Sequence, residues 1–221
     1  MDNVDPYTVP DVGVDKRKKR SEYLKKIVFA SRNHGKINEI RAMLADSDIS
    51  LVSLEEYPHI PQIVENGISF LENALIKAKT VAEATGEIAL ADDSGLEVDA
   101  LDGAPGIRSA RYAGQSADDA GNIRKLLHTL RKVPSEKRGA QFRCVLALYS
   151  PTDGCGETFD GCWRGVIAEE PVGCGGFGYD PIFFLPDLGM TVAELSPEVK
   201  NRLSHRAQAA AKLKKKITQR S

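Results

Sequence analysis

The order in which strand and helix patterns follow one another constrains the fold of this chain more than any other feature. Residues 26–30 form a short apolar run typical of a buried strand, and apolar residues recur at helical spacing over residues 37–44. The alternation continues until residues 140–149 and 157–168, two strand patterns joined by a turn containing Pro and Asp-Gly, which predicts a hairpin. Alternation favours parallel strands and a hairpin adds antiparallel ones, so we expect an α/β fold around a mixed sheet.

Later segments carry further helix and strand signals. Ser69 and Glu72 form a capping-box pattern ahead of a helix, whose apolar stripe is predicted to comprise Leu71, Leu75, Ala78 and Ala82. Ser116 and Asp119 are predicted to open the next helix. Residues 181–185 predict another strand, and residues 196–217 predict one final helix or two.

Length and charge narrow the class of protein. A chain of 221 residues suits one large domain or one domain split into two lobes; we expect a mobile N-terminal extension over residues 1–24 and the domain over residues 25–221. Lys and Arg total 30 against 31 Asp and Glu, so no overall field attracts nucleic acid, and basic clusters occur only near the two ends. No apolar run approaches the ~20 residues that span a bilayer, so we expect no membrane segment.

The pattern of the four cysteines indicates a protein of a reducing compartment rather than a metal site. They form no C-x-x-C pair, and Cys144 falls within a strand pattern, as expected of a buried thiol. A reducing cytoplasm is therefore expected. Zinc bound by Cys155, Cys162 and Cys174 is an alternative, but their spacing matches no known ligand pattern.

The polar turn after the first strand is a candidate phosphate-binding segment. A turn between a strand and a helix presents free backbone N–H groups and the positive end of the helix dipole. Gly35 lets the backbone come close to a ligand and Lys36 adds a mobile positive charge, although the G-x-x-x-x-G-K-[ST] pattern is absent. The alternative is an N-cap at Asn33 followed by an exposed lysine. The segment consists of Ser31, Arg32, Asn33, His34, Gly35 and Lys36.

Two adjacent carboxylates, Asp92 and Asp93, follow a predicted strand over residues 88–91 and precede Ser94. Their repulsion would be relieved by a divalent cation such as Mg²⁺, which prefers oxygen ligands. One carboxylate could then bind the metal while the other orients or deprotonates a water molecule. The alternative is a turn with an Asp cap. Glu65 could supply a third ligand or cap the helix that follows it, and its spacing leaves both open.

Residues 173–180 form a glycine-rich segment, with four glycines in its first six positions. Such a backbone could wrap a flat ligand, and Phe177 or Tyr179 could stack on a nucleobase, an interaction worth ~1–3 kcal/mol. Asp180 could accept hydrogen bonds from the base edge. Gly178 lies in the sequence between the two candidate stacking residues, Phe177 and Tyr179. A tight connection between two strands explains the pattern equally well.

Basic residues near the start of the last helical segment suggest an anion. If Ser204 caps a helix, His205 and Arg206 lie in its first turn, where the helix dipole disfavours positive charge unless an anion is near. Lys200 lies just before this turn. The alternative is a continuous surface helix with scattered basic residues.

Together these segments resemble one family, the non-canonical purine nucleoside triphosphate pyrophosphatases (inosine/xanthosine triphosphate pyrophosphatases). The resemblance spans residues 26–217 and also includes Glu65-Asn66-Gly67, Gly103-Ala104-Pro105-Gly106 and Ser109-Ala110-Arg111-Tyr112. It implies Mg²⁺-dependent hydrolysis of ITP, dITP and XTP to the monophosphate and pyrophosphate. It also implies a homodimer of two-lobed α/β subunits, each with a long mixed sheet flanked by helices and an active-site cleft between the lobes.

The resemblance also implies roles for individual residues. Asp93 would be the proton acceptor and a metal ligand, with Glu65 and the neighbouring Asp92 completing the metal set. Residues 31–36, Ser94 and Lys200 would hold the phosphates and sugar. The base pocket would be formed by Phe177, Gly178, Tyr179, Asp180, His205 and Arg206. One departure is Ser31-Arg32-Asn33, where many members have Thr-Gly-Asn, so that Arg32 lacks the conformational freedom of glycine.

A pocket with hydrogen-bond donors facing the 6-oxo group of hypoxanthine or xanthine would reject adenine, because burying its amino group there leaves polar groups unpaired. Arg206 or a backbone N–H could be that donor. Rejection of the 2-amino group of guanine has no assigned residue. Three alternatives stay open: a pyrophosphatase for modified pyrimidine or methylated nucleotides, a nucleotide-binding protein without turnover, and a nucleic-acid-binding protein.

Overall fold

The computed structural model describes residues 26–219, which places the predicted N-terminal extension outside the described residues. Within that range one mixed sheet has the strand order β2-β1-β3-β4-β5-β6-β7. β1 pairs in parallel with β2 and β3, and every later pair is antiparallel. The strands are β1 (Lys26–Phe29), β2 (Ser50–Ser53), β3 (Ala89–Val98), β4 (Gly139–Ser150), β5 (Cys155–Ile167), β6 (Phe183–Leu185) and β7 (Met190–Thr191).

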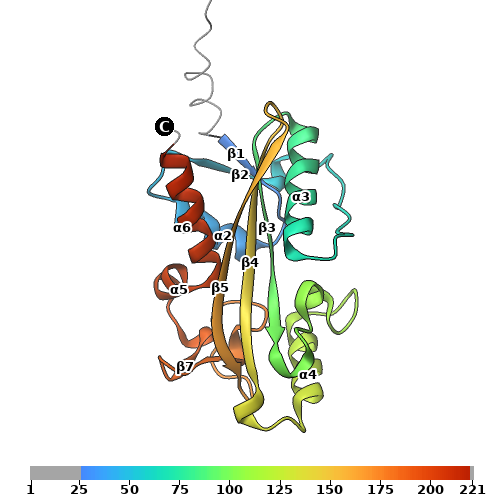
Figure 1. Ribbon diagram of the computed structural model, residues 1–221, viewed down its shortest axis with the longest axis vertical. Helices are drawn as coiled ribbons and strands as arrows, with labels where there is room; N and C mark the ends of the chain where they lie inside the picture. Colours follow the sequence, from blue (N-terminus) through green and yellow to red (C-terminus); the bar gives the residue numbers. More distant parts are fainter. Residues whose placement is uncertain (1–25, 220–221) are drawn as a thin grey trace, which may run out of the picture.

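Helices cover both faces of this sheet and divide the molecule into two lobes (Figure 1). In the upper lobe α3 packs on one face, with α2 and α6 on the other; α4 and the β6–β7 region belong to the lower lobe. This confirms the predicted two-lobed α/β fold. The helices are α2 (His34–Leu44), α3 (Phe70–Thr85), α4 (Asp119–Leu130), α5 (Pro197–Leu203) and α6 (His205–Thr218).

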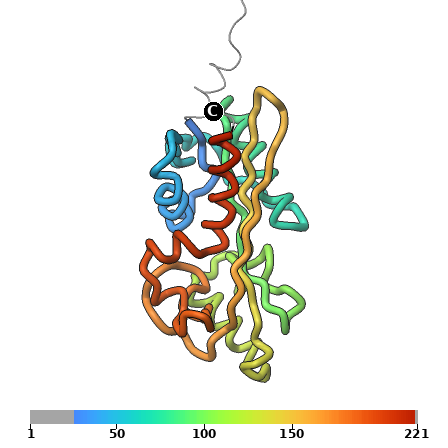
Figure 2. The backbone as a smooth tube through the Cα atoms, turned by 60° about the vertical axis from the view of Figure 1, so that its left-hand side comes forward, coloured from blue at the N-terminus to red at the C-terminus, as the bar shows by residue number. Residues whose placement is uncertain are grey.

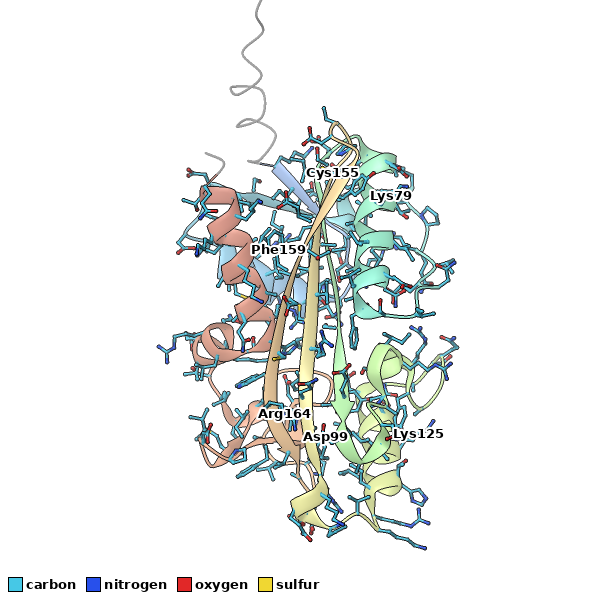
Figure 3. All side chains as sticks on the ribbon, viewed as in Figure 1. Lys79, Asp99, Lys125, Cys155, Phe159 and Arg164 are labelled. Carbon is cyan, nitrogen blue, oxygen red and sulfur yellow. The ribbon has the colours of Figure 1, made fainter. Side chains whose placement is uncertain are left out.

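The β4–β5 hairpin is common to both lobes. Its strands pair without interruption from Gly139↔Val166 to Ser150↔Cys155, and Figure 2 shows the hairpin running along nearly the whole height of the molecule. Near the lower end, Arg164 on β5 donates two hydrogen bonds, of 3.1 and 2.6 Å, to the carboxylate of Asp99 (Figure 3). The strands therefore continue past the junction of the lobes and connect them.

The main correction to the sequence prediction concerns β3. The strand does not end near Ala91 but continues to Val98, and each of its residues has a partner on β4. Asp92 and Asp93 therefore lie inside a strand rather than in a turn beyond its end. Asp, Ser and Gly have low strand propensity, but strand propensity depends on context, and pairing with β4 outweighs it here.

The helix predictions are confirmed in outline and corrected in detail. Ser69 caps α3 by accepting a hydrogen bond from the Glu72 backbone N–H at 3.2 Å. Leu71 is 46% exposed, so the buried face of α3 does not follow the predicted stripe and is formed largely by Phe70, Ala74, Ala78, Val81 and Ala82.

The remaining elements also differ slightly from the prediction. The N-cap of α4 is Asp118 rather than Ser116. The final segment forms two helices, α5 and α6, and Ser204 caps α6 as predicted. β6 starts at Phe183 because Asp180–Ile182 forms a 3-10 turn. None of the helices in residues 26–219 is both long and apolar enough to cross a membrane.

Candidate active site

The two adjacent carboxylates of β3 lie on opposite faces of the sheet. Successive side chains of a strand alternate between its faces, so neighbours in sequence cannot share one face. Asp92 faces Lys36 of α2 and Arg206 of α6, whereas Asp93 faces Lys77 of α3. Each carboxylate therefore has cations of its own, and a divalent ion is not needed to relieve repulsion between the two.

Asp92 is completely buried and fully hydrogen-bonded. Its Oδ1 accepts from Lys36 Nζ at 2.5 Å and Ser94 Oγ at 2.8 Å, and its Oδ2 from Arg206 Nε at 2.8 Å and Cys144 Sγ at 3.2 Å. Burial alone would raise the pKa of Asp92, but Arg206 and Lys36 outweigh it and hold this pKa well below its ordinary value. Both oxygens are occupied by protein groups, so the structure does not support the metal-ligand role expected of Asp92.

Asp93 differs in having one free carboxylate oxygen. Its Oδ1 accepts a hydrogen bond from Lys77 Nζ at 2.7 Å, while its Oδ2 is buried without a partner among the described residues. Lys77 Nζ also lies 3.0 Å from Glu65 Oε1 and donates to the Asp92 carbonyl at 2.8 Å. Burial raises the pKa of Asp93 despite the opposing charges of Lys77 and Lys36. A carboxylate of this kind is suited to receive a proton.

Asp93 and Glu65 are also the acids available to a metal ion. Residues 26–219 contain no group of three or more His, Cys, Asp and Glu side chains arranged to hold a metal, which leaves the alternative zinc site without support. Mg²⁺, however, is commonly bound through one or two carboxylates together with substrate phosphates. The free Oδ2 of Asp93 and the nearby Glu65 fit this kind of site.

The predicted phosphate turn combines a helix cap with a positive charge. Asn33 is the N-cap of α2, because its side-chain oxygen accepts from the Lys36 backbone N–H at 3.0 Å, and Ser31 Oγ accepts from Asn33 N at 3.1 Å. Arg32 points elsewhere and donates to the Ile60 carbonyl at 2.6 Å. His34 has a 78% exposed side chain. Within this turn, Lys36 and Asn33 are the residues that line the pocket described below.

Residues 173–180, here called the glycine turn, place the ring of Phe177 beside the phosphate turn. A Cβ atom added to Gly35 would lie 2.6 Å from that ring, so any other residue at this position would have to displace Phe177. Lys200 Nζ lies 4.5 Å, and Arg206 Cζ 5.7 Å, from the centre of the ring. Phe177 thus combines an aromatic ring with two nearby cations in the wall of the pocket.

Tyr179 and Asp180 form the buried end of the glycine turn. Tyr179 is buried and its hydroxyl donates to the Ser109 carbonyl at 2.9 Å, so it is less suited than Phe177 to stack on a base. Asp180 accepts from Lys200 and, at 2.9 Å, from the backbone N–H of Phe177. Burial raises the pKa of Asp180 in spite of Lys200.

The first turn of α6 supplies one positive charge to the site. Arg206 is buried and bonds Asp92, Glu39 and, at 2.9 Å, Ser94 Oγ. His205 stacks on Phe142 with ring centres 4.9 Å apart. Burial, reinforced by Arg206, holds the pKa of His205 well below its ordinary value, so its ring is neutral at physiological pH. The carboxylates of Asp92 and Glu39 thus stabilise the positive charge of Arg206 at the start of the helix, and no bound anion is needed to explain it.

The buried neutral ring of His205 predicts a pH dependence of stability. Its pKa is lower in the folded than in the unfolded chain, so below about pH 6.5 the unfolded state binds the extra proton and stability falls as the pH falls, by up to about 1.4 kcal/mol per pH unit. Urea unfolding measures the free energy of unfolding at pH 7.0 and at pH 5.0. Between these two pH values, it is expected to fall less in His205→Gln than in the parent chain. An equal loss in the two proteins would show that His205 is not the titrating group.

One pocket gathers most of the predicted substrate-binding residues. It is lined by Asn33, Lys36, Ser94, Phe177, Gly178, Tyr179, Asp180, Lys200, His205 and Arg206. Predicted site residues that do not line it are Ser31, Arg32, His34, Gly35, Glu65, Asp92 and Asp93. The acids Asp93 and Glu65 lie by α3, on the opposite face of β3 from Asp92. The predicted residues therefore form a pocket with aromatic and cationic walls and a separate acidic group on the α3 face of β3, and the charge of Lys36, which lines the pocket, acts on both Asp92 and Asp93.

Several residues of the site were missed from the sequence. Glu39 bonds both Lys200, at 2.8 Å, and Arg206. Its position on α2, three residues after Lys36, was the available signal, because such residues lie on the same helix face. Lys77 was detectable as a lysine on a helix face whose other buried residues, apart from Asn73, are apolar. Phe142 and Asp119, which also line the pocket, carry no local signal of a site.

Comparison with known proteins identifies the family of this chain. The chain matches the model of the Ham1 family over residues 27–216. It is 53% identical over 189 residues to a dITP/XTP pyrophosphatase of Geobacter sulfurreducens, covering 86% of this chain and 94% of the relative. It is 52% identical over 187 residues to a dITP/XTP pyrophosphatase of Yersinia pseudotuberculosis, covering 84% and 94% of the two chains.

The solved structure of a HAM1 protein from Coxiella burnetii has a TM-score of 0.81 at 46% identity, covering 88% of this chain and 98% of that chain. Sequence and structure thus identify the same group of proteins, and the resemblance drawn from the motifs is confirmed. This chain belongs to the Ham1 family.

Proposed function

We propose that this chain hydrolyses dITP, XTP and ITP between the α- and β-phosphates, giving the nucleoside monophosphate and pyrophosphate. The observation that carries the proposal is Asp93, a buried carboxylate with one free oxygen beside Lys77 and Glu65. Lys36 connects it to the aromatic pocket, because Lys36 lines that pocket and its charge acts to lower the pKa of both Asp92 and Asp93. Relatives about half identical to this chain are dITP/XTP pyrophosphatases, which supports the same substrates here.

Base recognition follows from the walls of the pocket. Phe177 provides an aromatic wall for a purine, and the cations of Lys200 and Arg206 lie over its ring. A 6-oxo group accepts hydrogen bonds from such donors, whereas the amino group of adenine presents another donor and leaves them unpaired. This chemistry favours hypoxanthine and xanthine over adenine.

The reaction is assigned to the acidic part of the site. Asp93 accepts a proton from the attacking water, whose oxygen bonds to the α-phosphorus while the bond to the β-phosphate oxygen breaks. Lys77 holds Asp93 in place and adds positive charge near the phosphates. Asp93 and Glu65 would hold Mg²⁺, which would offset the charge of the triphosphate and its leaving group.

Product analysis in ¹⁸O-labelled water tests this function. We expect XTP to give equal amounts of XMP and pyrophosphate, with the label in XMP, because water attacks the α-phosphorus. Formation of XDP and inorganic phosphate would refute the proposal. Label in the pyrophosphate would instead place the attack on the β-phosphorus.

Three alternatives are separable from this function. A pyrophosphatase for modified pyrimidines would prefer those triphosphates to XTP. A binding protein without turnover would retain XTP and release no pyrophosphate. A nucleic-acid-binding protein would need free basic residues, yet Lys212, Lys214 and Lys216 pair with Asp160, Asp46 and Glu157. The other basic cluster, residues 16–20, lies outside the described residues.

We also propose a homodimer and a cytoplasmic location. Val64, Ile68 and Leu71 are large apolar side chains on the surface, and Ile68 and Leu71 line a groove there. Exposed apolar patches of this kind favour association. The four cysteines are free thiols, in keeping with a reducing compartment. Sedimentation analysis that gave a monomer at micromolar concentration would refute the dimer.

A further inference from the structure

The start of α4 carries two adjacent carboxylates with different tasks. Asp118 is the N-cap, and its Oδ1 accepts from the Gly121 backbone N–H at 2.7 Å. Asp119 is not needed for capping. Its Oδ2 accepts instead from the backbone N–H of Gly178, at 2.7 Å and 59 residues further along the chain. α4 is thereby bonded to the glycine turn beside the pocket.

The other hydrogen bonds in this part of the glycine turn involve Phe177 and Tyr179, whereas the backbone N–H of Gly178 is bonded by Asp119. The N–H of Phe177 bonds Asp180, which belongs to the turn itself, and the Tyr179 hydroxyl bonds the Ser109 carbonyl. Gly178 lies between them with φ +62°, a conformation that glycine adopts without strain. The Asp119 contact is therefore the one that fixes the peptide immediately after the stacking residue Phe177.

Burial distinguishes this contact from the two beside it. Tyr179 and Asp180 are 5% and 3% exposed, whereas Asp119 is exposed and lines the pocket together with Phe177 and Gly178. An exposed hydrogen bond at the edge of a pocket can break without unfolding the parts that it joins. Loss of this contact would free the Gly178 peptide and leave the buried support in place.

We propose that Asp119 is a positioning residue for base recognition: its bond to Gly178 holds the glycine turn, and with it Phe177, in the conformation that accepts an oxopurine. The inference rests on the proposed function and assigns part of its specificity to α4. Asp93 and Lys77, which serve the chemical step, lie on the α3 face of β3 and do not contact Asp119 or the glycine turn in the described structure. Asp119 is therefore expected to affect substrate binding rather than the chemical step.

Steady-state kinetics of Asp119→Ala test the proposal. With XTP, KM is expected to rise about tenfold, because a hydrogen bond to a charged acceptor is lost, while kcat stays within about twofold. The ratio of kcat/KM for XTP over ATP is expected to fall. Asp119→Asn keeps an oxygen that can accept from Gly178 and is expected to restore most of the affinity. Asp118→Ala is the matched control, since it removes a neighbouring carboxylate and the helix cap without touching the glycine turn.

Hydrogen exchange provides a readout that does not depend on turnover. Asp119→Ala is expected to speed amide exchange in residues 173–180, whereas Asp118→Ala is expected to speed it only in α4. Unchanged exchange in the glycine turn, or an unchanged KM in an active Asp119→Ala protein, would overturn the proposal. Equal KM changes in the Asp118 and Asp119 variants would overturn it as well. A parent chain that releases no pyrophosphate would refute the proposed function, while the exchange experiment would still test the contact.

Discussion

Asp93→Asn is expected to lower kcat for XTP by at least about 10³-fold while leaving the fold intact. The amide cannot accept the proton of the attacking water, and general-base catalysis alone is worth ~10²–10⁴-fold. The substitution also removes one of the two acids proposed to hold Mg²⁺. Stability should change little, because the side chains have the same shape and Lys77 keeps its contacts with Glu65 and the Asp92 carbonyl. Single-turnover kinetics and thermal unfolding monitored by circular dichroism measure the two effects.

Glu97→Gln is the matched control for this variant. Glu97 lies on the same strand and the same face as Asp93, but it bonds Gln141 at 2.7 Å and does not line the active-site pocket. Its replacement should leave kcat near that of the parent chain. A kcat within tenfold of the parent in Asp93→Asn would remove Asp93 from the role of proton acceptor.

Asp92→Ala is expected to destabilise the fold by about 3–5 kcal/mol, because it leaves buried cations without their partner. Arg206 has a 2% and Lys36 a 17% exposed side chain, so neither charge is well hydrated. The pKa of Asp92 is well below its ordinary value in the folded chain. The stabilisation is therefore present above about pH 4 and is lost as the pH falls through the folded pKa. Urea unfolding at pH 7 measures the difference.

Asp99→Ala serves as the comparison. Asp99 also pairs with an arginine, but both side chains of the Asp99–Arg164 pair are more than half exposed, and such pairs contribute about 0–1 kcal/mol. Asp92→Ala should therefore unfold at a clearly lower urea concentration than Asp99→Ala. Equal midpoints would mean that Asp92 does not hold the buried cations together.

Sequence patterns predict those parts of the fold whose decisive contacts are local. The caps at Ser69 and Ser204 lie three residues from the N–H groups that they accept from, so each is visible in a short window. The β4–β5 hairpin is equally local, since a short turn joins its strands. Most residues that line the pocket were also predicted. They belong to short segments of unusual composition, namely the glycine-rich residues 173–180 with their aromatic side chains and the basic residues at the start of the last helix.

The course of β3 could not be predicted in this way. Asp-Asp-Ser-Gly favours a turn locally, but pairing with β4 extends the strand, and Lys36, Lys77 and Arg206 provide charges for its acids. The Arg206–Glu39 pair joins residues 167 positions apart, and no short pattern indicates it. The same holds for the hydrogen bond from Gly178 to Asp119. Tertiary contacts therefore decide that both oxygens of Asp92 are hydrogen-bonded and that one oxygen of Asp93 is left without a partner among the described residues.

Base-selective pyrophosphate release is measured most directly with XTP, dITP, GTP and ATP, each with and without Mg²⁺, at substrate concentrations well below KM. We expect Mg²⁺-dependent release in which kcat/KM for XTP and dITP exceeds that for ATP by at least about 10²-fold, since a site built for an oxo group leaves its donors unpaired with adenine. Equal rates for XTP and ATP, or no release from any of the four, would contradict the assignment of this site to oxopurine nucleotides.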